Sequence, residues 1–275
     1  MAARSAVINV MTRAAEKAGR AILRDFGEVE QLQVSRKGPA DFVSAADRKA
    51  ESFVRQELQK MRPDFGLLME EAGAIPGKDP ANRWIVDPLD GTTNFLHGLP
   101  HWAVSIALER EGEIVAGVIY DPVKDEMFWA EKGAGAFLNH KRLRVSGRRV
   151  MADALVATGI PFKGHGDGPV FTAQLNAVMS EVSGIRRFGS AALDLAYVAA
   201  GRFDAYWEMD LKPWDVAAGV IIVTEAGGYV TEIGGGRNPA GGASVLAANP
   251  ALHPALDTLI RNAMPKAPPS TPAAG

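Results

Sequence analysis

The rhythm of apolar residues changes along the chain, and this limits the folds open to it. Apolar side chains at helical spacing over residues 6–22 predict an amphipathic helix that ends near Gly27. A second helical pattern runs from Ser44 to Met61. After Trp84 the apolar residues alternate with period two, which indicates an antiparallel meander. We expect residues 1–145 to form N-terminal helices and an antiparallel sheet, with strands at 29–34, 65–69, 84–86, 104–108, 114–120, 126–130 and 136–138.

The second part of the chain, residues 146–264, alternates strand patterns with helix patterns. Strands are expected at 154–159, 185–188, 203–209, 229–232 and 245–247. Helices are expected at 171–182, 190–200, 216–226 and from Pro250 onward. This order predicts an α/β chain in which helices and sheets lie in layers. The proline-rich residues 265–275 are expected to be disordered.

Composition excludes several classes of protein. The net charge of -2 gives no strong field for nucleic acid, so a nucleic-acid partner is not expected. Without cysteine, the chain has no disulfide, thiolate zinc site or cysteine nucleophile. Charged residues interrupt the N-terminal apolar pattern, so we do not expect a secretory signal there. The sequence has no stretch of 18 consecutive apolar residues, so no membrane span is predicted. We therefore expect a cytoplasmic protein without a membrane partner.

An acidic run lies where the chain changes from helices to sheet. Trp84-Ile85-Val86 predicts a short strand that ends at Asp87, and Asp90 follows three residues later. Two carboxylates so close repel each other when both are ionised, and a divalent cation with a preference for oxygen, Mg²⁺ or Mn²⁺, relieves this repulsion. Backbone N–H groups from Gly91 to Thr93 suit a phosphate oxygen at the start of a short helix. The competing interpretation is an ordinary turn, since Asp, Pro, Gly and Thr are common turn and cap residues.

The complete run, residues 87–95, resembles the signature of the inositol monophosphatase family, which belongs to a superfamily of lithium-sensitive, magnesium-dependent phosphatases. The resemblance extends from Lys37 to about Asn249. It implies an α-β-α-β-α sandwich, a homodimer, and hydrolysis of a small phosphorylated polyol.

Upstream segments match the same family. Glu70 and Glu71 resemble its Gly-Glu-Glu segment, with Met69 in place of glycine, and this makes Glu70 a metal ligand that also touches the attacking water. Asp47 resembles the last residue of its Asp-x-Val-Thr-x-x-Asp segment, which implies that Asp47 and Thr92 orient or deprotonate a water. The alternative for Asp47 is a capping box with Ser44, and the alternative for Glu71 is an exposed charge.

Downstream segments complete the resemblance. Asp215 matches the second family signature, which implies a ligand of a second metal that also touches substrate; the alternative is an N-cap for helix 216–226. By the same resemblance, Glu208 accepts a hydrogen bond from a polyol hydroxyl. The turn Gly189-Ser190-Ala191 contacts substrate, with a plain N-cap at Ser190 as the alternative.

These assignments give one mechanism. Two Mg²⁺ ions balance the four ligand carboxylates, and a phosphate dianion leaves room for a third, weaker Mg²⁺. Asp87 bridges two metals, and the Leu89 carbonyl joins one shell. A water oriented by Thr92 and Asp47 attacks phosphorus in line, without a covalent phospho-enzyme. The predicted catalytic residues are Asp47, Glu70 and Thr92; the metal ligands are Glu70, Asp87, Leu89, Asp90 and Asp215; the substrate contacts are Glu70, Leu89, Asp90, Gly91, Thr92, Gly189, Ser190, Ala191, Glu208 and Asp215.

The substrate stays open at this point. Inositol 1-monophosphate, hydrolysed to myo-inositol and phosphate, is the first hypothesis because a carboxylate at Glu208 suits a polyol donor. Histidinol phosphate, a sugar phosphate or a 3′-phosphorylated adenine nucleotide would be hydrolysed by the same chemistry. The basic residues Arg186 and Arg187, close to Gly189, keep the adenine nucleotide as an alternative substrate. From a different class, the resemblance also admits a regulator that binds the transcription machinery.

Overall fold

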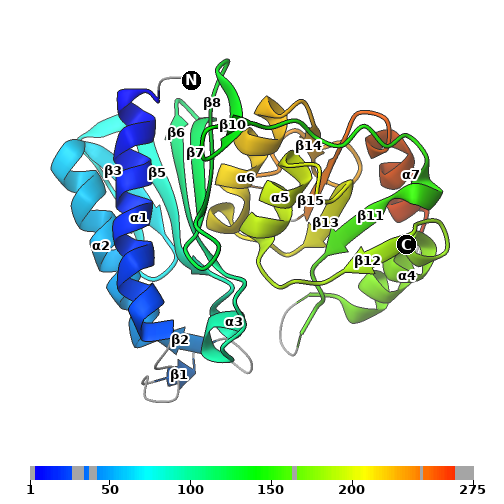
Figure 1. Ribbon diagram of the computed structural model, residues 1–275, viewed down its shortest axis with the longest axis horizontal. Coiled ribbons are helices and arrows are strands. Elements are labelled where there is room, and N and C mark those ends of the chain that lie inside the picture. Colours follow the sequence, from blue (N-terminus) through cyan, green and yellow to red (C-terminus); the bar gives the residue numbers. More distant parts are fainter. Residues whose placement is uncertain (1–3, 27–33, 37–41, 163–165, 242–243, 264–275) are drawn as a thin grey trace, which may run out of the picture.

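The computed structural model describes residues 4–26, 34–36, 42–162, 166–241 and 244–263. Its elements form five layers in the order α-β-α-β-α, as expected, with the two sheets separated by the helix pair α5 and α6 (Figure 1). Residues 29–33 of the predicted strand 29–34, the segment 37–41 and the tail 265–275 lie outside the described residues. The division of the chain at residue 145 stays a prediction.

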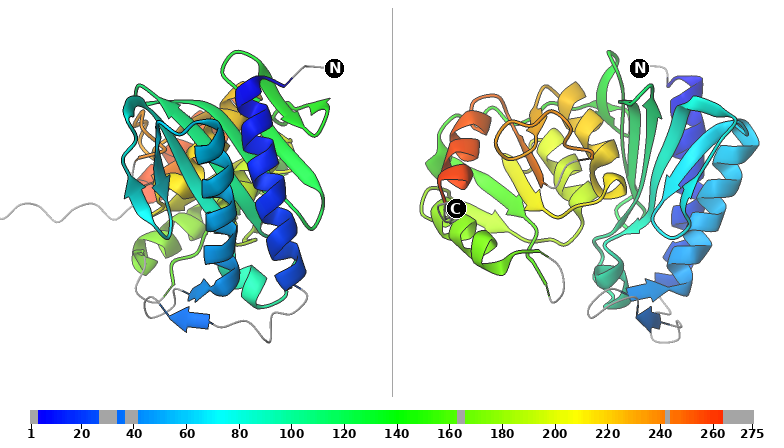
Figure 2. Two further views of the ribbon diagram at one scale, coloured as in Figure 1. Left: turned by 90° about the vertical axis from the view of Figure 1, so that its left-hand side faces the viewer. Right: turned by 180° about the vertical axis from the view of Figure 1, so that it is seen from behind.

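The first outer layer pairs α1 (Ala6–Phe26) with α2 (Ala45–Met61). Ser5 caps α1, since its hydroxyl oxygen accepts the Ile8 N–H at 3.2 Å. Ala14, Ala15 and Ala18 give α1 a fully buried face of small residues, which packs with α2 against the sheet (Figure 2). Both helices agree with the apolar periodicity.

The described part of the chain contains an eight-stranded sheet in the order β10-β9-β8-β7-β6-β5-β3-β4. Alternate side chains pack on opposite faces: Ile85 joins the core around α5 and α6, whereas Trp84 and Val86 face α1 and α2. The strands are β3 (Phe65–Met69), β4 (Gly73–Ile75), β5 (Asp79–Asp90), β6 (Ala103–Arg110), β7 (Glu113–Asp121), β8 (Glu126–Glu131), β9 (Gly135–Leu138) and β10 (Lys141–Arg142).

Two predictions for this sheet are wrong. The sheet is mixed, because β3 and β5 are parallel. The strand predicted to end at Asp87 continues to Asp90, with a register shift against β6 between these residues. Pro88 lies in this shift and has no N–H to donate, so pairing is interrupted there and resumes at Asp90. The short α3 (Thr92–Leu96) follows.

The second sheet has the strand order β12-β11-β13-β15-β14 within the described residues. It lies between α5 and α6 on one face and α4 and α7 on the other (Figure 1). A small hairpin, β1 (Val34–Arg36) with β2 (Phe42–Ser44), lies apart from both sheets. The remaining elements are β11 (Leu155–Thr158), α4 (Gly168–Met179), β12 (Gly184–Arg186), α5 (Ala191–Ala199), β13 (Ala205–Met209), α6 (Pro213–Glu225), β14 (Tyr229–Thr231), β15 (Ser244–Ala248) and α7 (His253–Ala263).

Sequence predicted each element of the second sheet and its flanking helices, with shifted ends, whereas β2 was not predicted and the predicted strand 29–34 shares only Val34 with β1. Helices α4, α6 and α7 each begin three residues away from the predicted start; α4 begins at Gly168 instead of Phe171 because Asp167 caps it by accepting the Val170 N–H at 3.0 Å. Helix α6 begins at Pro213, where proline fits the first helical position. No helix in the described ranges has the length and apolar character needed to cross a membrane.

Candidate active site

The end of β5 holds the acidic run in a tight backbone arrangement. Asp87 Oδ1 accepts the Leu89 N–H at 2.9 Å, which fixes the turn after Asp87. Gly91 has φ 93°, a conformation that residues with a side chain rarely adopt, and a Cβ there would approach the His101 carbonyl oxygen to 3.1 Å. Glycine thus lets the chain turn from β5 into α3, as the sequence predicted for a short-helix start.

Asp90 connects the end of β5 to the start of α5. Its Oδ2 accepts hydrogen bonds from the Ser190 hydroxyl and, at 2.8 Å, from the Ala192 N–H at the start of α5. Ser190 also caps α5, since its Oγ accepts the Leu193 N–H at 3.3 Å. The capping interpretation of Ser190 is therefore correct, and the same side chain holds a predicted metal ligand.

Asn94 of α3 fixes the neighbouring turn. Its Nδ2 donates to the carbonyl oxygens of His101 and Phe188, each at 2.8 Å. These bonds place Gly189, which has φ 86°, close to α3. The predicted substrate turn Gly189-Ser190-Ala191 is thereby brought beside the acidic run, although Ser190 itself is buried.

Thr92 and Asp47 meet as predicted. The Thr92 hydroxyl lies 3.3 Å from Asp47 Oδ2 and 2.9 Å from the Leu89 carbonyl oxygen. Asp47 is buried in the first turn of α2. The proposed capping partner of Asp47 is the Ser44 side chain, which lies outside the described side chains.

Glu70 and Glu71 also lie close to Asp47. Carboxylate oxygens of Asp47, Glu70 and Glu71 lie within 4.8 Å of one another, a spacing that suits one metal ion. The Glu71 N–H donates to Glu51 Oε2 at 2.9 Å, and Glu71 is half-buried, so the alternative of a plain exposed charge is wrong. Sequence analysis did not place Glu71 among the ligands, and its position directly after Glu70 was the only signal.

Asp215 projects from the first turn of α6. It is the third residue of that helix and not its N-cap, which is Lys212, so the alternative interpretation of Asp215 is wrong in position. Asp215 nevertheless closes the helix start, because its Oδ2 accepts the Lys212 N–H at 2.7 Å. The structure gives the second oxygen of Asp215, like that of Asp87, no hydrogen bond from the described residues.

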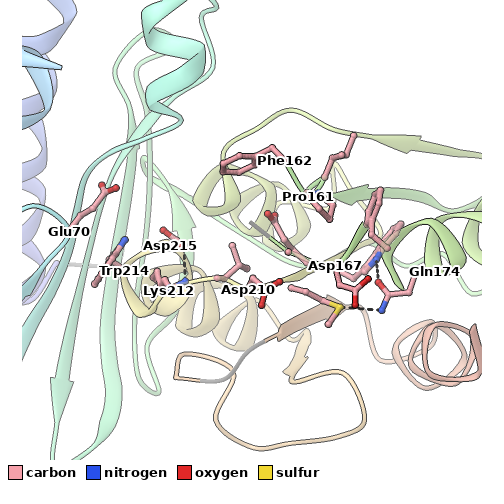
Figure 3. Close-up of a pocket in the computed structure, with 17 residues that line it drawn as sticks. Glu70, Pro161, Phe162, Asp167, Gln174, Asp210, Lys212, Trp214 and Asp215 are labelled. Carbon is pink, nitrogen blue, oxygen red and sulfur yellow. Dashed lines mark hydrogen bonds between the residues drawn. The ribbon is translucent and has the colours of Figure 1, made fainter. Parts of the chain in front are cut away.

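A cavity of about 380 Å³ opens beside these carboxylates. Glu70 and Asp215 lie at one end of the cavity, whereas Asp167 and Gln174 lie at the other (Figure 3). Glu208 also lines it, so three of the predicted site residues share one space. The other predicted site residues are not among those that line the cavity: Asp47, Asp87, Leu89, Asp90, Gly91, Thr92, Gly189, Ser190 and Ala191.

The buried carboxylates raise one another's pKa. For Asp87, burial raises the pKa well above its usual value, and the negative charges of Glu70 and Asp90 raise it further. Burial likewise raises the pKa of Asp215 well above its usual value, and Asp90 adds to the effect. Burial raises the pKa of Asp90 to about 6, although hydrogen bonds from Ser190 and from the start of α5 act in the opposite direction.

This donor set fits a hard divalent cation. All its side-chain donors are carboxylate oxygens, the ligands that Mg²⁺ and Mn²⁺ prefer. Their charges are buried and repel one another, a cost that a bound cation removes. The described histidines do not belong to this cluster.

Comparison with known proteins decides the family. The sequence profile of the inositol monophosphatase family matches residues 3–266. The chain belongs to the inositol monophosphatase family. Its members are metal-dependent phosphatases, so the predicted phosphoric monoester hydrolase is confirmed at the level of the reaction. The acidic cluster of Asp47, Glu70 and Glu71 could hold a metal ion.

Individual relatives agree with this assignment. An inositol-1-monophosphatase from Rhizobium meliloti is 56% identical over 263 residues, which cover 96% of this chain and 99% of that protein. The crystal structure of extragenic suppressor protein suhB from Bartonella henselae superimposes with a TM-score of 0.90 at 58% identity, covering 94% of this chain and 99% of that one. A protein named Nus factor SuhB, from Pasteurella multocida, is 43% identical over 246 residues, which cover 90% of this chain and 92% of that protein.

Asp194, a buried carboxyl group close to the site, was missed by the sequence analysis. Asp194 of α5 is 1% exposed, and burial raises its pKa well above the usual value, with the charges of Glu208 and Asp90 adding to the effect. Its Oδ1 has no hydrogen-bond partner among the described residues. A signal was present, because Asp194 is the one charged residue in the otherwise apolar helix 191–199.

Proposed function

We propose that this phosphatase hydrolyses inositol 1-monophosphate to myo-inositol and phosphate, with Mg²⁺ as its cofactor. The observation that carries the proposal is the convergence of Glu70 and Asp215 on the cavity that also contains Glu208 (Figure 3). Glu70 and Asp215 can hold Mg²⁺, which in turn binds the substrate phosphate. The Glu208 carboxylate can accept a hydrogen bond from a substrate hydroxyl. The 56% identity to an inositol-1-monophosphatase supports the same substrate.

Glu70, Asp87, Asp90, Asp215 and the Leu89 carbonyl oxygen would hold two Mg²⁺ ions, with a third, weaker ion near Asp47. When bound, Mg²⁺ neutralises the phosphate charge, lowers the pKa of water and stabilises the leaving alkoxide. The Leu89 carbonyl oxygen already accepts the Thr92 hydroxyl, so the turn that fixes one ligand also orients a catalytic residue. Manganese is expected to replace magnesium because it accepts the same oxygen ligands.

The chain's own residues position the attack. The single Thr92 hydroxyl proton has two acceptors within reach, the Leu89 carbonyl oxygen and Asp47 Oδ2. When the hydroxyl donates to Asp47, its oxygen can accept a hydrogen bond from the attacking water, and Thr92 can pass its own proton to Asp47 as it takes up the proton of the water. The backbone N–H groups of Gly91, Thr92 and Thr93 are not used within α3, so they are available to phosphate oxygens. At the far side of the phosphate, Glu208 accepts a hydrogen bond from a hydroxyl of the alcohol. Gly189, Ser190 and Ala191 complete the substrate contacts.

Phosphate release from a panel of monoesters tests the proposal. Inositol 1-phosphate is compared with histidinol phosphate, a sugar phosphate and a 3′-phosphorylated adenine nucleotide, with Mg²⁺ titrated and Li⁺ added. We expect the highest kcat/KM for inositol 1-phosphate, no turnover in EDTA and inhibition by Li⁺. A higher kcat/KM for another monoester would transfer the proposal to that substrate, and Mg²⁺-independent turnover would contradict the metal assignment.

Asp90→Asn is the decisive variant for the metal site. An asparagine Oδ1 can still accept from Ser190 and Ala192, so the fold is expected to persist by circular dichroism. The loss of a ligand charge should lower kcat by about a hundred- to a thousandfold, as the removal of a major electrostatic contact does. Glu181→Gln, which changes an exposed carboxylate outside the site, serves as the control. Wild-type turnover by folded Asp90→Asn would overturn the assignment.

The alternative of a regulator that binds the transcription machinery is supported by the 43% identity to a protein named Nus factor SuhB. Binding and hydrolysis are separable in the Asp90→Asn variant, because a binding role should survive the loss of catalysis. A pull-down with this variant and growth complementation distinguish the two. We also propose a cytoplasmic homodimer, which sedimentation and cell fractionation test.

A further inference from the structure

Gly159 and Glu208 lie side by side on neighbouring strands. Strands β11 and β13 are parallel, with Thr158 opposite Trp207, so the next residues along each strand, Gly159 and Glu208, point to the same face of the sheet. Both line the active-site cavity. The larger polar residue is therefore next to a residue that has no side chain.

The Glu208 carboxylate occupies the space that a side chain at position 159 would need. A Cβ built on Gly159 would overlap Cδ and both carboxylate oxygens of Glu208. Glycine is needed at this position because of steric space and not because of backbone conformation, since Gly159 is not among the residues with positive φ. An alanine at this position would have to move the carboxylate or the end of β11.

Glu208 has little freedom to move elsewhere. The hydroxyl of the buried Tyr206, two residues earlier on the same face, donates to its Oε2. This bond would be broken if the carboxylate shifted, which would leave a buried hydroxyl without its acceptor. Tyr206 therefore holds one oxygen, and Gly159 provides the surface on which the carboxylate rests.

We propose that Gly159 is a specificity-determining positioning residue, which lets Glu208 lie across the end of β11 and present its Oε1 to a substrate hydroxyl. The inference rests on the proposed function, in which Glu208 accepts a hydrogen bond from the alcohol. It makes the preference for phosphate esters of polyols, over esters of alcohols without a hydroxyl within reach of Glu208, depend on the glycine at position 159. The phosphate and metal contacts do not involve Gly159.

A double-mutant cycle tests this inference in the full-length, Mg²⁺-loaded enzyme. Gly159→Ala, Glu208→Ala and the double variant are assayed with inositol 1-phosphate and with phenyl phosphate, whose alcohol has no second hydroxyl. We expect Gly159→Ala to raise KM for inositol 1-phosphate roughly tenfold or more, as loss of one hydrogen bond to a charged group does. The kcat/KM for phenyl phosphate should change by less than about twofold, because this substrate makes no hydrogen bond to Glu208.

The double variant separates positioning from folding. Once Glu208 is alanine, the methyl group at position 159 has room, so the double variant should match Glu208→Ala in both assays. Gly168→Ala is the matched control, because a Cβ there meets nothing within 4 Å. Should Gly159→Ala not fold, the comparison of the double variant with Glu208→Ala carries the test, and equal kinetics support the inference.

Two results would overturn the inference. One is an unchanged KM for inositol 1-phosphate in folded Gly159→Ala, and the other is a further loss caused by Gly159→Ala in the Glu208→Ala background. Failure of the proposed function looks different: the wild-type enzyme would hydrolyse neither ester, or Glu208→Ala would leave the preference for inositol 1-phosphate intact.

Discussion

Asp194 shows what an unpaired acid does to a folded protein. Its Oδ1 has no hydrogen-bond partner in the described structure, and burial raises its pKa well above that of an unfolded chain. The folded protein therefore keeps a proton that the unfolded chain releases above about pH 4. The free energy of unfolding must fall as pH rises from about 4 toward the folded pKa, by about 1.4 kcal/mol for each unit of separation.

Asp194→Asn should remove this loss. In metal-free buffer with EDTA, we expect the variant to match the wild type near pH 4 and to be more stable at pH 8, measured by urea unfolding. Asp204→Asn is the control, because the buried Asp204 carboxylate accepts the Leu155 N–H at 2.7 Å and pairs with Arg148. Destabilisation of Asp194→Asn at pH 8 to the same degree as Asp204→Asn would show that the ionised carboxylate has a stabilising role.

Individual residues also show where sequence reasoning stopped. The structure brings together Asp47 and Thr92, which are 45 positions apart, as the family resemblance implied. Gly159 could not be predicted, because its importance depends on the register of two strands that are distant in sequence. Spacing along one strand cannot reveal which residue lies beside it on the next.

At the level of elements, glycines set how closely the helices approach the large sheet. A Cβ on Gly117 of β7 would lie 2.6 Å from Ile221 Cγ2 and 2.7 Å from the Ala218 carbonyl oxygen, both on α6. On the other face, a Cβ on Gly19 of α1 would lie 2.8 Å from Pro122 and Tyr120. Helix α6 carries Asp215 in its first turn, so its distance from the sheet fixes the position of one ligand.

Gly117→Ala should therefore reduce both stability and metal affinity. Overpacking at a helix–sheet contact costs about 1–3 kcal/mol, and the shift of α6 should raise the Mg²⁺ concentration needed for half-maximal turnover. Thermal unfolding and Mg²⁺ titration measure the two effects. The control is Gly147→Ala, where an added Cβ has open space. An unchanged melting temperature in Gly117→Ala would mean that the layer spacing is not set at this glycine.

Elements were more predictable from sequence than their pairing. The helices α1 and α2 followed directly from apolar periodicity, because each buries one continuous face. The parallel pairing of β3 with β5 was not foreseen, since periodicity shows which residues are buried but not which strand lies alongside. The extension of β5 to Asp90 was also missed, because Pro88 signals a break that the sheet accommodates by a register shift.

In the whole molecule, the carboxylate cluster joins the large sheet to the middle layer of helices. Asp87 and Asp90 lie at the end of a strand of the large sheet, whereas Asp215 lies in the first turn of α6, and Asp90 is held by the start of α5. Without metal, these groups repel one another across the contact between the sheet and the helices. A cation bound there should stabilise the assembly as a unit, because it binds the folded chain only.

The stabilisation by Mg²⁺ should depend on pH in a defined direction. Burial raises the folded pKa of Asp90 to about 6, whereas the unfolded value is near 4, so the metal-free protein loses stability as pH rises from about 4 through about 6. Bound Mg²⁺ favours the ionised form and reverses that loss. The rise in melting temperature on adding Mg²⁺ should thus be small at pH 5 and large at pH 7.5, where a concentration of 100 Kd contributes about 2.7 kcal/mol.

Differential scanning calorimetry at both pH values, with and without EDTA, measures this difference. Potassium chloride at matched ionic strength separates ion binding from charge screening. In Asp90→Asn the metal-free protein should be more stable than the wild type at pH 7.5, because one repelling charge is gone, and its response to Mg²⁺ should be reduced at that pH. Equal Mg²⁺ responses at pH 5 and pH 7.5, or in the variant and the wild type, would mean that the cation does not act through these carboxylates.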